Sequence, residues 1–149
     1  MGSDSVEPFL THSNKWAVVL ALTSNEGAKD FQFLTSEGQV PLFESVVKKC
    51  LLWGSSENLM FVVGATRSQD IAKIRELAPD HFFLVPGVGA QGGSLDEVVQ
   101  YGMNADCGLL VNSSRGIIYA DSSKDFAISA KKEASKIQSA MELHLRRFH

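Results

Sequence analysis

Four short apolar runs divide the sequence, at residues 16–22, 59–64, 82–86 and 108–112. They are too short for typical helices, and their Val, Leu and Phe residues follow one another without polar alternation. Continuous apolar runs of this kind are typical of strands that are covered by helices on both faces of a sheet. We therefore predict four buried strands.

Helical periodicity follows each of these runs, over residues 40–53, 68–78, 94–101 and 125–146, and a shorter helical segment at 5–11 precedes the first. The alternation of strand and helix predicts an α/β fold with parallel strands and right-handed crossovers. In the last helix, apolar residues recur every three or four positions and predict a single apolar stripe. The stripe consists of Phe126, Ala130, Ala134, Ile137, Met141 and Leu145.

Length and charge limit the classes of protein that the sequence can represent. A chain of 149 residues with 44% hydrophobic content and no Pro-, Gly- or charge-rich linker predicts one domain over residues 1–149. The net charge of -3 provides no basic excess, so neither nucleic acid nor an anionic membrane is an expected partner. No apolar stretch reaches the ~18–20 residues of a membrane span, and no secretory signal is recognisable. We expect a cytoplasmic protein.

The two cysteines predict neither a disulfide framework nor a metal site. Cys50 and Cys107 each lie in an apolar run, without a second Cys or a His at ligand spacing. We expect both to be buried thiols.

Polar or small residues follow every predicted strand, at 23–25, 65–67, 87–93 and 112–115. The carboxyl ends of parallel strands meet at one edge of the sheet, where α/β proteins bind their ligands. We therefore expect the functional site at this edge.

The loop after the third strand, within FFLVPGVGAQGGS, contains Gly87, Gly89, Gly92 and Gly93 around the single amide side chain of Gln91. Glycines let backbone N–H groups approach a ligand closely, and the following helix start adds partial positive charge. This combination predicts an anion site, most often one for phosphate.

A second anion donor follows the fourth strand. Arg115 comes after two serines and before Gly116, so its guanidinium could face the same anion as the glycine loop. In eight-stranded β/α barrels the loops after the last two strands form the usual phosphate site, and the glycine loop and Arg115 follow the last two predicted strands here.

The segments VPGVGAQGG and NSSRGIIYA, together with VLALTSN on an earlier strand, resemble orotidine 5'-phosphate decarboxylase, the last enzyme of UMP synthesis. The resemblance extends over nearly all of the chain, and MGSDSVEPF resembles the segment just after the fourth strand of that family. It implies a TIM (β/α)8 barrel that converts orotidine monophosphate to UMP and CO2 without a cofactor or metal.

The resemblance covers only the C-terminal half of such a barrel, units five to eight, because a whole barrel takes roughly 250 residues. The family's catalytic Asp-x-Lys-x-x-Asp array is absent, and the nearest cluster, Asp121-Ser-Ser-Lys124-Asp125, follows the last strand in a different order. We therefore expect no catalytic residue in this chain and no activity from the chain alone. The expected partners are the nucleotide and either the missing N-terminal half-barrel or further copies in a homo-oligomer.

The resemblance also implies roles for individual residues. Gln91 and Arg115 would grip the 5'-phosphate, with backbone N–H groups around Ser114 and Gly116 completing the cradle. Ser24 would contact the pyrimidine edge and reach toward Gln91. The glycines at 87–93 would let their loop close over the substrate as a mobile lid.

The sequence is compatible with several alternatives. The chain could be a phosphate-binding half-barrel without catalysis, or a flavodoxin-like domain whose glycine loop has converged. Ser24 also fits ordinary turn chemistry. We expect Arg67, after the second strand, to be a solvated residue at a helix start rather than a ligand.

Overall fold

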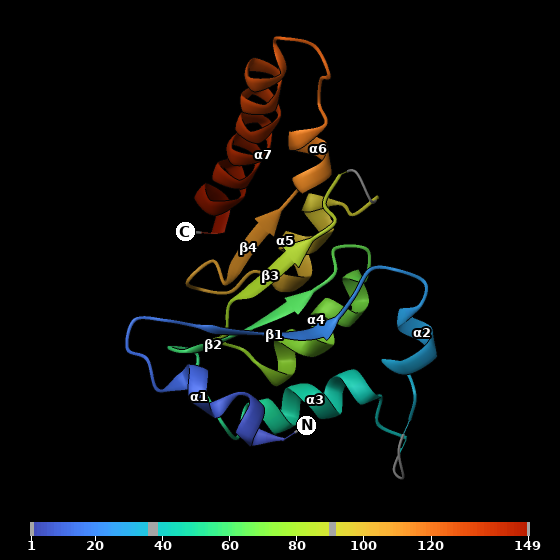
Figure 1. The fold of residues 1–149 in the computed structure, drawn as a ribbon, viewed down its shortest axis with the longest axis vertical. Coiled ribbons are helices and arrows are strands. Elements are labelled where there is room, and N and C mark those ends of the chain that lie inside the picture. The colour runs from blue at the N-terminus through green and yellow to red at the C-terminus, as the bar shows by residue number, and fades with distance from the viewer. Residues whose placement is uncertain (1, 36–38, 90–91, 149) are drawn as a thin grey trace.

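The computed structural model describes residues 2–35, 39–89 and 92–148. Four parallel strands form a single sheet in the sequential order β1-β2-β3-β4 (Figure 1). This confirms the predicted α/β fold, and each strand begins or ends within one residue of its predicted bounds. The strands are β1 (Ala17–Leu22), β2 (Leu59–Val63), β3 (Phe83–Pro86) and β4 (Leu109–Asn112).

The predicted helices are also present among the described residues, with two short additions. A 3-10 turn, η1 (Ser3–Ser5), and α1 (Glu7–Leu10) together replace the single helix expected at 5–11. The additions are α2 (Ala28–Phe31) and α6 (Ser114–Ile118), which are too short to show a periodic pattern. The remaining helices are α3 (Leu42–Cys50), α4 (Ser68–Leu77), α5 (Leu95–Gly102) and α7 (Phe126–Phe148).

The strand register separates the two faces of the sheet. One row of partners runs through Val19, Phe61, Phe83 and Leu109, and the last three of these are almost completely buried. This face packs against α3, α4 and α5, whose buried side chains complete the core. They include Phe43, Val47, Ile71, Ile74 and Val98.

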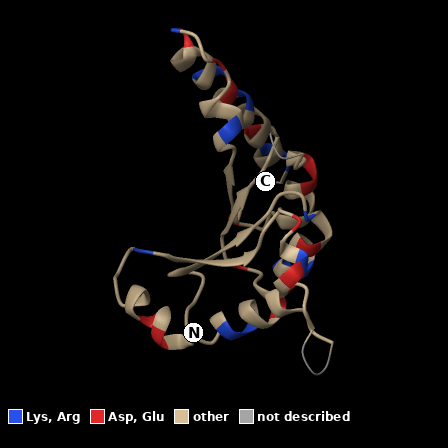
Figure 2. Cartoon of the chain, turned by 45° about the vertical axis from the view of Figure 1, so that its right-hand side comes forward, with Lys and Arg blue, Asp and Glu red and all other residues tan. Residues whose placement is uncertain are grey.

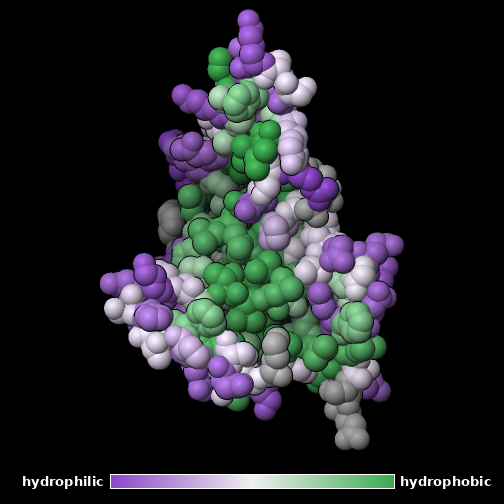
Figure 3. All heavy atoms as spheres, in the orientation of Figure 1, coloured by the Kyte–Doolittle hydropathy of each residue, from purple (hydrophilic) through white to green (hydrophobic). Residues whose placement is uncertain are grey.

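The opposite face of the sheet is open. Val18, Leu20 and Leu110 expose 47%, 55% and 45% of their surface there, although the strands carry no charged residue (Figure 2). Apolar side chains gather over the middle of the molecule on the face seen in Figure 3. The expectation that helices cover both faces is therefore wrong for this chain.

The one-sided sheet also decides against the flavodoxin-like alternative. Flavodoxin-like sheets have the strand order 2-1-3-4-5 and helices on both faces. The sequential order seen here, with one covered face, is that of consecutive units of a β/α barrel.

Helix α7 runs beside α6 and projects beyond the sheet (Figure 1). None of its described side chains is buried, and Phe126 is 58% exposed. Of the predicted apolar stripe, Met141 and Leu145 alone pack against the core cluster. The stripe therefore contacts the core only near the carboxyl end of the helix.

The two thiols differ from each other. Cys50 is buried in the core, and burial raises the pKa of its thiol. Cys107 is only partly buried and adopts a left-handed φ of 70° in the turn before β4, so its predicted burial is wrong.

Candidate phosphate and pyrimidine site at the carboxyl edge of the sheet

The structure brings the glycine loop and Arg115 to one small cavity at the carboxyl ends of β3 and β4. The cavity has a volume of about 70 Å³, which suits a small group rather than a whole nucleotide. Neighbouring parallel strands place their carboxyl ends side by side, which is why residues so far apart in sequence meet here. The residues that line the cavity are Pro86, Gly87, Val88, Asn112, Ser113, Ser114 and Arg115.

The glycine loop depends on backbone conformations that other residues rarely adopt. Gly87, Gly89 and Gly92 have φ values of 99°, 76° and 84°. A Cβ at Gly93 would lie 2.4 Å from the Cβ of Ala65, so this glycine allows the loop to pack closely on the end of β2. Gln91 lies outside the described residues.

Hydrogen bonds within the loop use part of the predicted phosphate cradle. The N–H groups of Gly89, Gly92 and Gly93 donate to the carbonyls of Gly93, Gly89 and Gly87 at 3.0, 2.8 and 3.2 Å. These three amides are therefore engaged inside the loop in this conformation. The expectation that the glycines offer their N–H groups to an anion does not hold for them here.

Ser113, which the sequence did not single out, joins the glycine loop to the end of β4. Its Oγ donates to the Val88 carbonyl at 2.9 Å, and the residue is buried. This bond fixes the two walls of the cavity relative to each other. Sequence offers no signal for it, because the partners are 25 residues apart and meet only in the folded sheet.

Residues 114–116 begin helix α6 instead of prolonging the strand end. The N–H and Oγ of Ser114 both donate to Asn112 Oδ1, at 3.2 and 2.8 Å, so this N–H is occupied. Arg115 and Gly116 follow in the first turn, where helix geometry leaves N–H groups without an intrahelical acceptor. Arg115 is exposed, and no carboxylate among the described residues pairs with its guanidinium.

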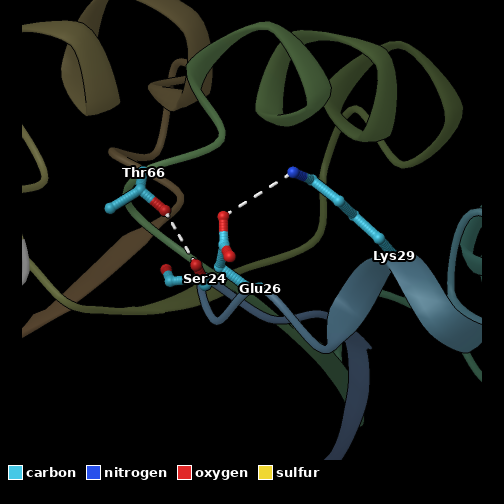
Figure 4. Close-up of polar contacts among 4 residues, drawn as sticks. All are labelled: Ser24, Glu26, Lys29 and Thr66. Carbon is cyan, nitrogen blue, oxygen red and sulfur yellow. Dashed lines mark hydrogen bonds and ion pairs between the residues drawn. The ribbon is translucent and has the colours of Figure 1, made fainter.

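Ser24 lies at the same edge of the sheet, just after β1. Its Oγ is buried and has no hydrogen-bond partner among the described residues. A Cβ at Gly64 would lie 2.2 Å from this oxygen, so only glycine leaves room for it. Thr66 Oγ1 donates to the Ser24 carbonyl at 3.4 Å, next to the exposed ion pair of Lys29 with Glu26 (Figure 4).

Gln32 is a second residue that sequence reasoning missed. Its Oε1 accepts from the Thr23 N–H at 2.8 Å, and its Nε2 donates to Thr23 Oγ1 at 2.9 Å. The carboxamide thereby holds the residue directly before Ser24. The short helix α2 that brings Gln32 into place gave no periodic signal.

Arg67 is not the solvated residue that we expected. Its guanidinium carbon lies 5.2 Å from the centre of the Phe33 ring, and its Nε is buried without a partner among the described residues. The side chain is therefore half-buried and packs beside the carboxyl edge of the sheet.

The described part of the chain has neither a metal site nor a membrane-spanning helix. It contains no group of three or more His, Cys, Asp or Glu residues that could hold a metal ion. It also contains no helix that is long and apolar enough to cross a membrane.

Curated proteins that are similar to this chain over nearly its whole length share one name. The orotidine 5'-phosphate decarboxylase of Phocaeicola vulgatus is 55% identical over 142 residues, which is 95% of this chain and 52% of the relative. That of Flavobacterium johnsoniae is 57% identical over 141 residues, which is 95% of this chain and 51% of the relative. The chain is homologous to orotidine 5'-phosphate decarboxylases. It spans about half the length of the curated relatives that it matches, and no protein-family model matches it.

Solved structures agree with this relationship to orotidine 5'-phosphate decarboxylases. UMP synthase from Leishmania donovani superposes with a TM-score of 0.77 at 39% identity, over 93% of this chain and 31% of that protein. OMP decarboxylase from the same organism gives a TM-score of 0.75 at 36% identity, over 93% of this chain and 53% of that protein. The four strands thus form a partial barrel, in agreement with the resemblance seen in the sequence.

Proposed function

We propose that the chain supplies the nucleotide-binding half of an orotidine 5'-phosphate decarboxylase. The whole protein would convert orotidine monophosphate to UMP and CO2 in the cytoplasm, as a lyase without a cofactor. The observation that carries the proposal is the single cavity shared by the glycine loop and Arg115. Residues 1–149 would form units five to eight, the C-terminal half of the barrel.

Within this half, Arg115 would provide the fixed positive charge for the substrate phosphate. Arg115 already borders the cavity, and no acidic side chain of the described residues forms an ion pair with its guanidinium. A charged donor on a phosphate forms a short and strong hydrogen bond. The backbone N–H groups of Arg115 and Gly116, next to Ser114, and the Gln91 amide would complete the phosphate contacts.

Ser24 would contact the pyrimidine edge of the same nucleotide. Its hydroxyl is a buried polar group without a partner among the described residues, and such a group is costly unless a ligand satisfies it. Ser24 follows β1 and the phosphate cavity lies between β3 and β4, so a bound nucleotide would extend across the carboxyl edge of the sheet.

The reacting groups would come from the other half of the barrel. The resemblance places an Asp and Lys array at the end of the third strand, where a lysine ammonium protonates the carbanion left at C6. Phosphate binding at a distance from that carbon can contribute energy to the transition state. The partner of this chain would thus be a complementary half-barrel. It would cover the open apolar face of the sheet, on which Leu20 and Leu110 are exposed.

The Arg115→Ala substitution tests the proposed phosphate contact in an assembled barrel that contains these residues. A hydrogen bond to a charged group contributes about 1.5–3 kcal/mol, so UMP should bind roughly tenfold to a hundredfold more weakly. Uridine lacks the phosphate and should bind the variant and the original protein alike. Isothermal titration calorimetry with both ligands measures the difference.

Arg147→Ala is the matched control, because Arg147 is exposed near the end of α7, away from the cavity. It should leave the affinity for UMP unchanged. Equal UMP affinity in Arg115→Ala and the original protein, with the fold intact, would contradict the phosphate role.

A further inference from the structure

We propose that Gln32 is a positioning residue for pyrimidine recognition: it holds Thr23, and thereby sets Ser24 for its contact with the base. The inference rests on the proposed function, because it takes Ser24 as the pyrimidine contact. Gln32 itself would not touch the substrate.

The two hydrogen bonds between Gln32 and Thr23, here called the clamp, require a carboxamide side chain. Gln32 uses its carbonyl oxygen to accept from the Thr23 backbone N–H and its amide nitrogen to donate to the Thr23 hydroxyl, at 2.8 and 2.9 Å. One planar group thus satisfies both a donor and an acceptor of the same residue. The pair restricts both the backbone and the side-chain torsion of Thr23.

The clamp is anchored on the hydrophobic core. The Gln32 backbone donates to the Ala28 carbonyl at 2.8 Å and accepts from the Phe43 N–H at 3.0 Å. Phe43 is 1% exposed, and its ring lies 5.4 Å from that of Phe33. A group tied to a packed core in this way is a rigid support for the strand end beside it.

Ser24 is held from its other side as well. Thr66 Oγ1 donates to the Ser24 carbonyl. Gly64 packs so closely on Ser24 that a Cβ at this glycine would clash with the Ser24 Oγ. The Gly64 N–H donates to the Leu22 carbonyl at 2.9 Å, which ties the ends of β1 and β2 together. The Ser24 hydroxyl is thus surrounded by neighbours that do not bond it, so its hydrogen-bonding capacity is unused among the described residues.

The test compares two ligands that differ in the base. UMP carries a pyrimidine and a phosphate, whereas ribose 5-phosphate carries only the phosphate, and both are titrated against an assembled barrel that contains these residues. In Gln32→Leu, loss of the positioning should weaken UMP binding by roughly threefold to tenfold, the effect of one neutral hydrogen bond. Affinity for ribose 5-phosphate should stay within about twofold, because the phosphate cavity lies at β3 and β4.

Two further variants make the result specific. Gln100→Leu removes an exposed glutamine of α5 and should change neither affinity. In a Ser24→Ala background, Gln32→Leu should cause almost no further loss of UMP affinity, because the hydroxyl that it positions is gone. Structural damage would instead add to the effect of Ser24→Ala.

The outcomes separate this inference from the proposed function. Equal weakening of both ligands by Gln32→Leu, or an undiminished effect in the Ser24→Ala background, would overturn the positioning role and leave the proposed function standing. An original barrel that binds neither ligand would overturn the proposed function, and the inference with it.

Discussion

Arg75 joins the amino ends of β3 and β4 at the edge of the sheet opposite the candidate site. Its guanidinium lies 3.8 Å from the centre of the Phe83 ring, and burial lowers its pKa to about 10. The side chain therefore stays charged at neutral pH and is satisfied by carbonyl oxygens alone. The acceptors are those of Ala78, Pro79, His81, Gly102 and Gly108, at 2.7–3.1 Å.

His81, beside this arginine, makes stability depend on pH. Its ring is buried 5.7 Å from that of Phe61, and neither ring nitrogen has a partner among the described residues. Burial, and to a lesser extent the charge of Arg75, lower the pKa of His81, while Asp80 opposes the shift. The folded protein thus holds a neutral imidazole that the unfolded chain protonates below a pH of about 6.5.

We predict that His81 gives the free energy of unfolding no pH dependence above pH ~6.5. Below this pH, the free energy of unfolding should fall as the pH drops. Below pH ~6.5 the unfolded chain binds a proton at His81 that the folded chain does not bind. Urea titrations between pH 7.5 and 5.5 measure the slope, and His81→Phe should reduce it. Substitution of the exposed His12 by Gln is the control and should leave the slope as it was; an equal slope in His81→Phe would contradict the prediction.

At the scale of elements, the strands and long helices could be predicted because buried positions are occupied by apolar residues in a recognisable pattern. The apolar runs located all four strands, and the parallel arrangement brought the glycine loop and Arg115 to one edge as expected. The short helices α2 and α6 could not be predicted, since four or five residues show no period. Contacts such as Ser113 with Val88 were equally inaccessible, because they depend on tertiary placement rather than on local pattern.

The junction of β1 and β2 gives a prediction about how closely two strand ends pack. In Gly64→Ala, the new Cβ would meet Ser24 Oγ at 2.2 Å and Ser24 N at 2.6 Å, so the end of β1 must move. We expect a loss of about 1–3 kcal/mol in the free energy of unfolding, the usual cost of overpacking. Urea unfolding measures the loss.

Gly27→Ala is the matched control for this junction. Gly27 is exposed with a φ of -61°, and its nearest neighbour is the side chain of Asn25. Its free energy of unfolding should change by less than about 0.5 kcal/mol. A Gly64→Ala protein as stable as the control would show that Ser24 is not confined as the structure indicates.

For the whole molecule, the apolar sheet face and the two edge strands belong to one feature. β1 and β4 end the sheet without a further strand in the described part of the chain, and they expose Val18, Leu20 and Leu110 on its open face. Unpaired edges and a continuous apolar face favour association with another chain or segment. Relatives of about twice the length contain enough additional sequence for four more strands.

The most direct test of the central claim is the turnover of orotidine monophosphate by two separate half-barrels, alone and mixed. The complementary half is the part of the Phocaeicola vulgatus relative that this chain does not match. We predict no conversion to UMP by either half alone, and conversion by the mixture once sedimentation shows a complex of the two. Conversion by this chain alone, in a preparation free of longer polypeptides, would contradict the account, as would an inactive complex of the two folded halves.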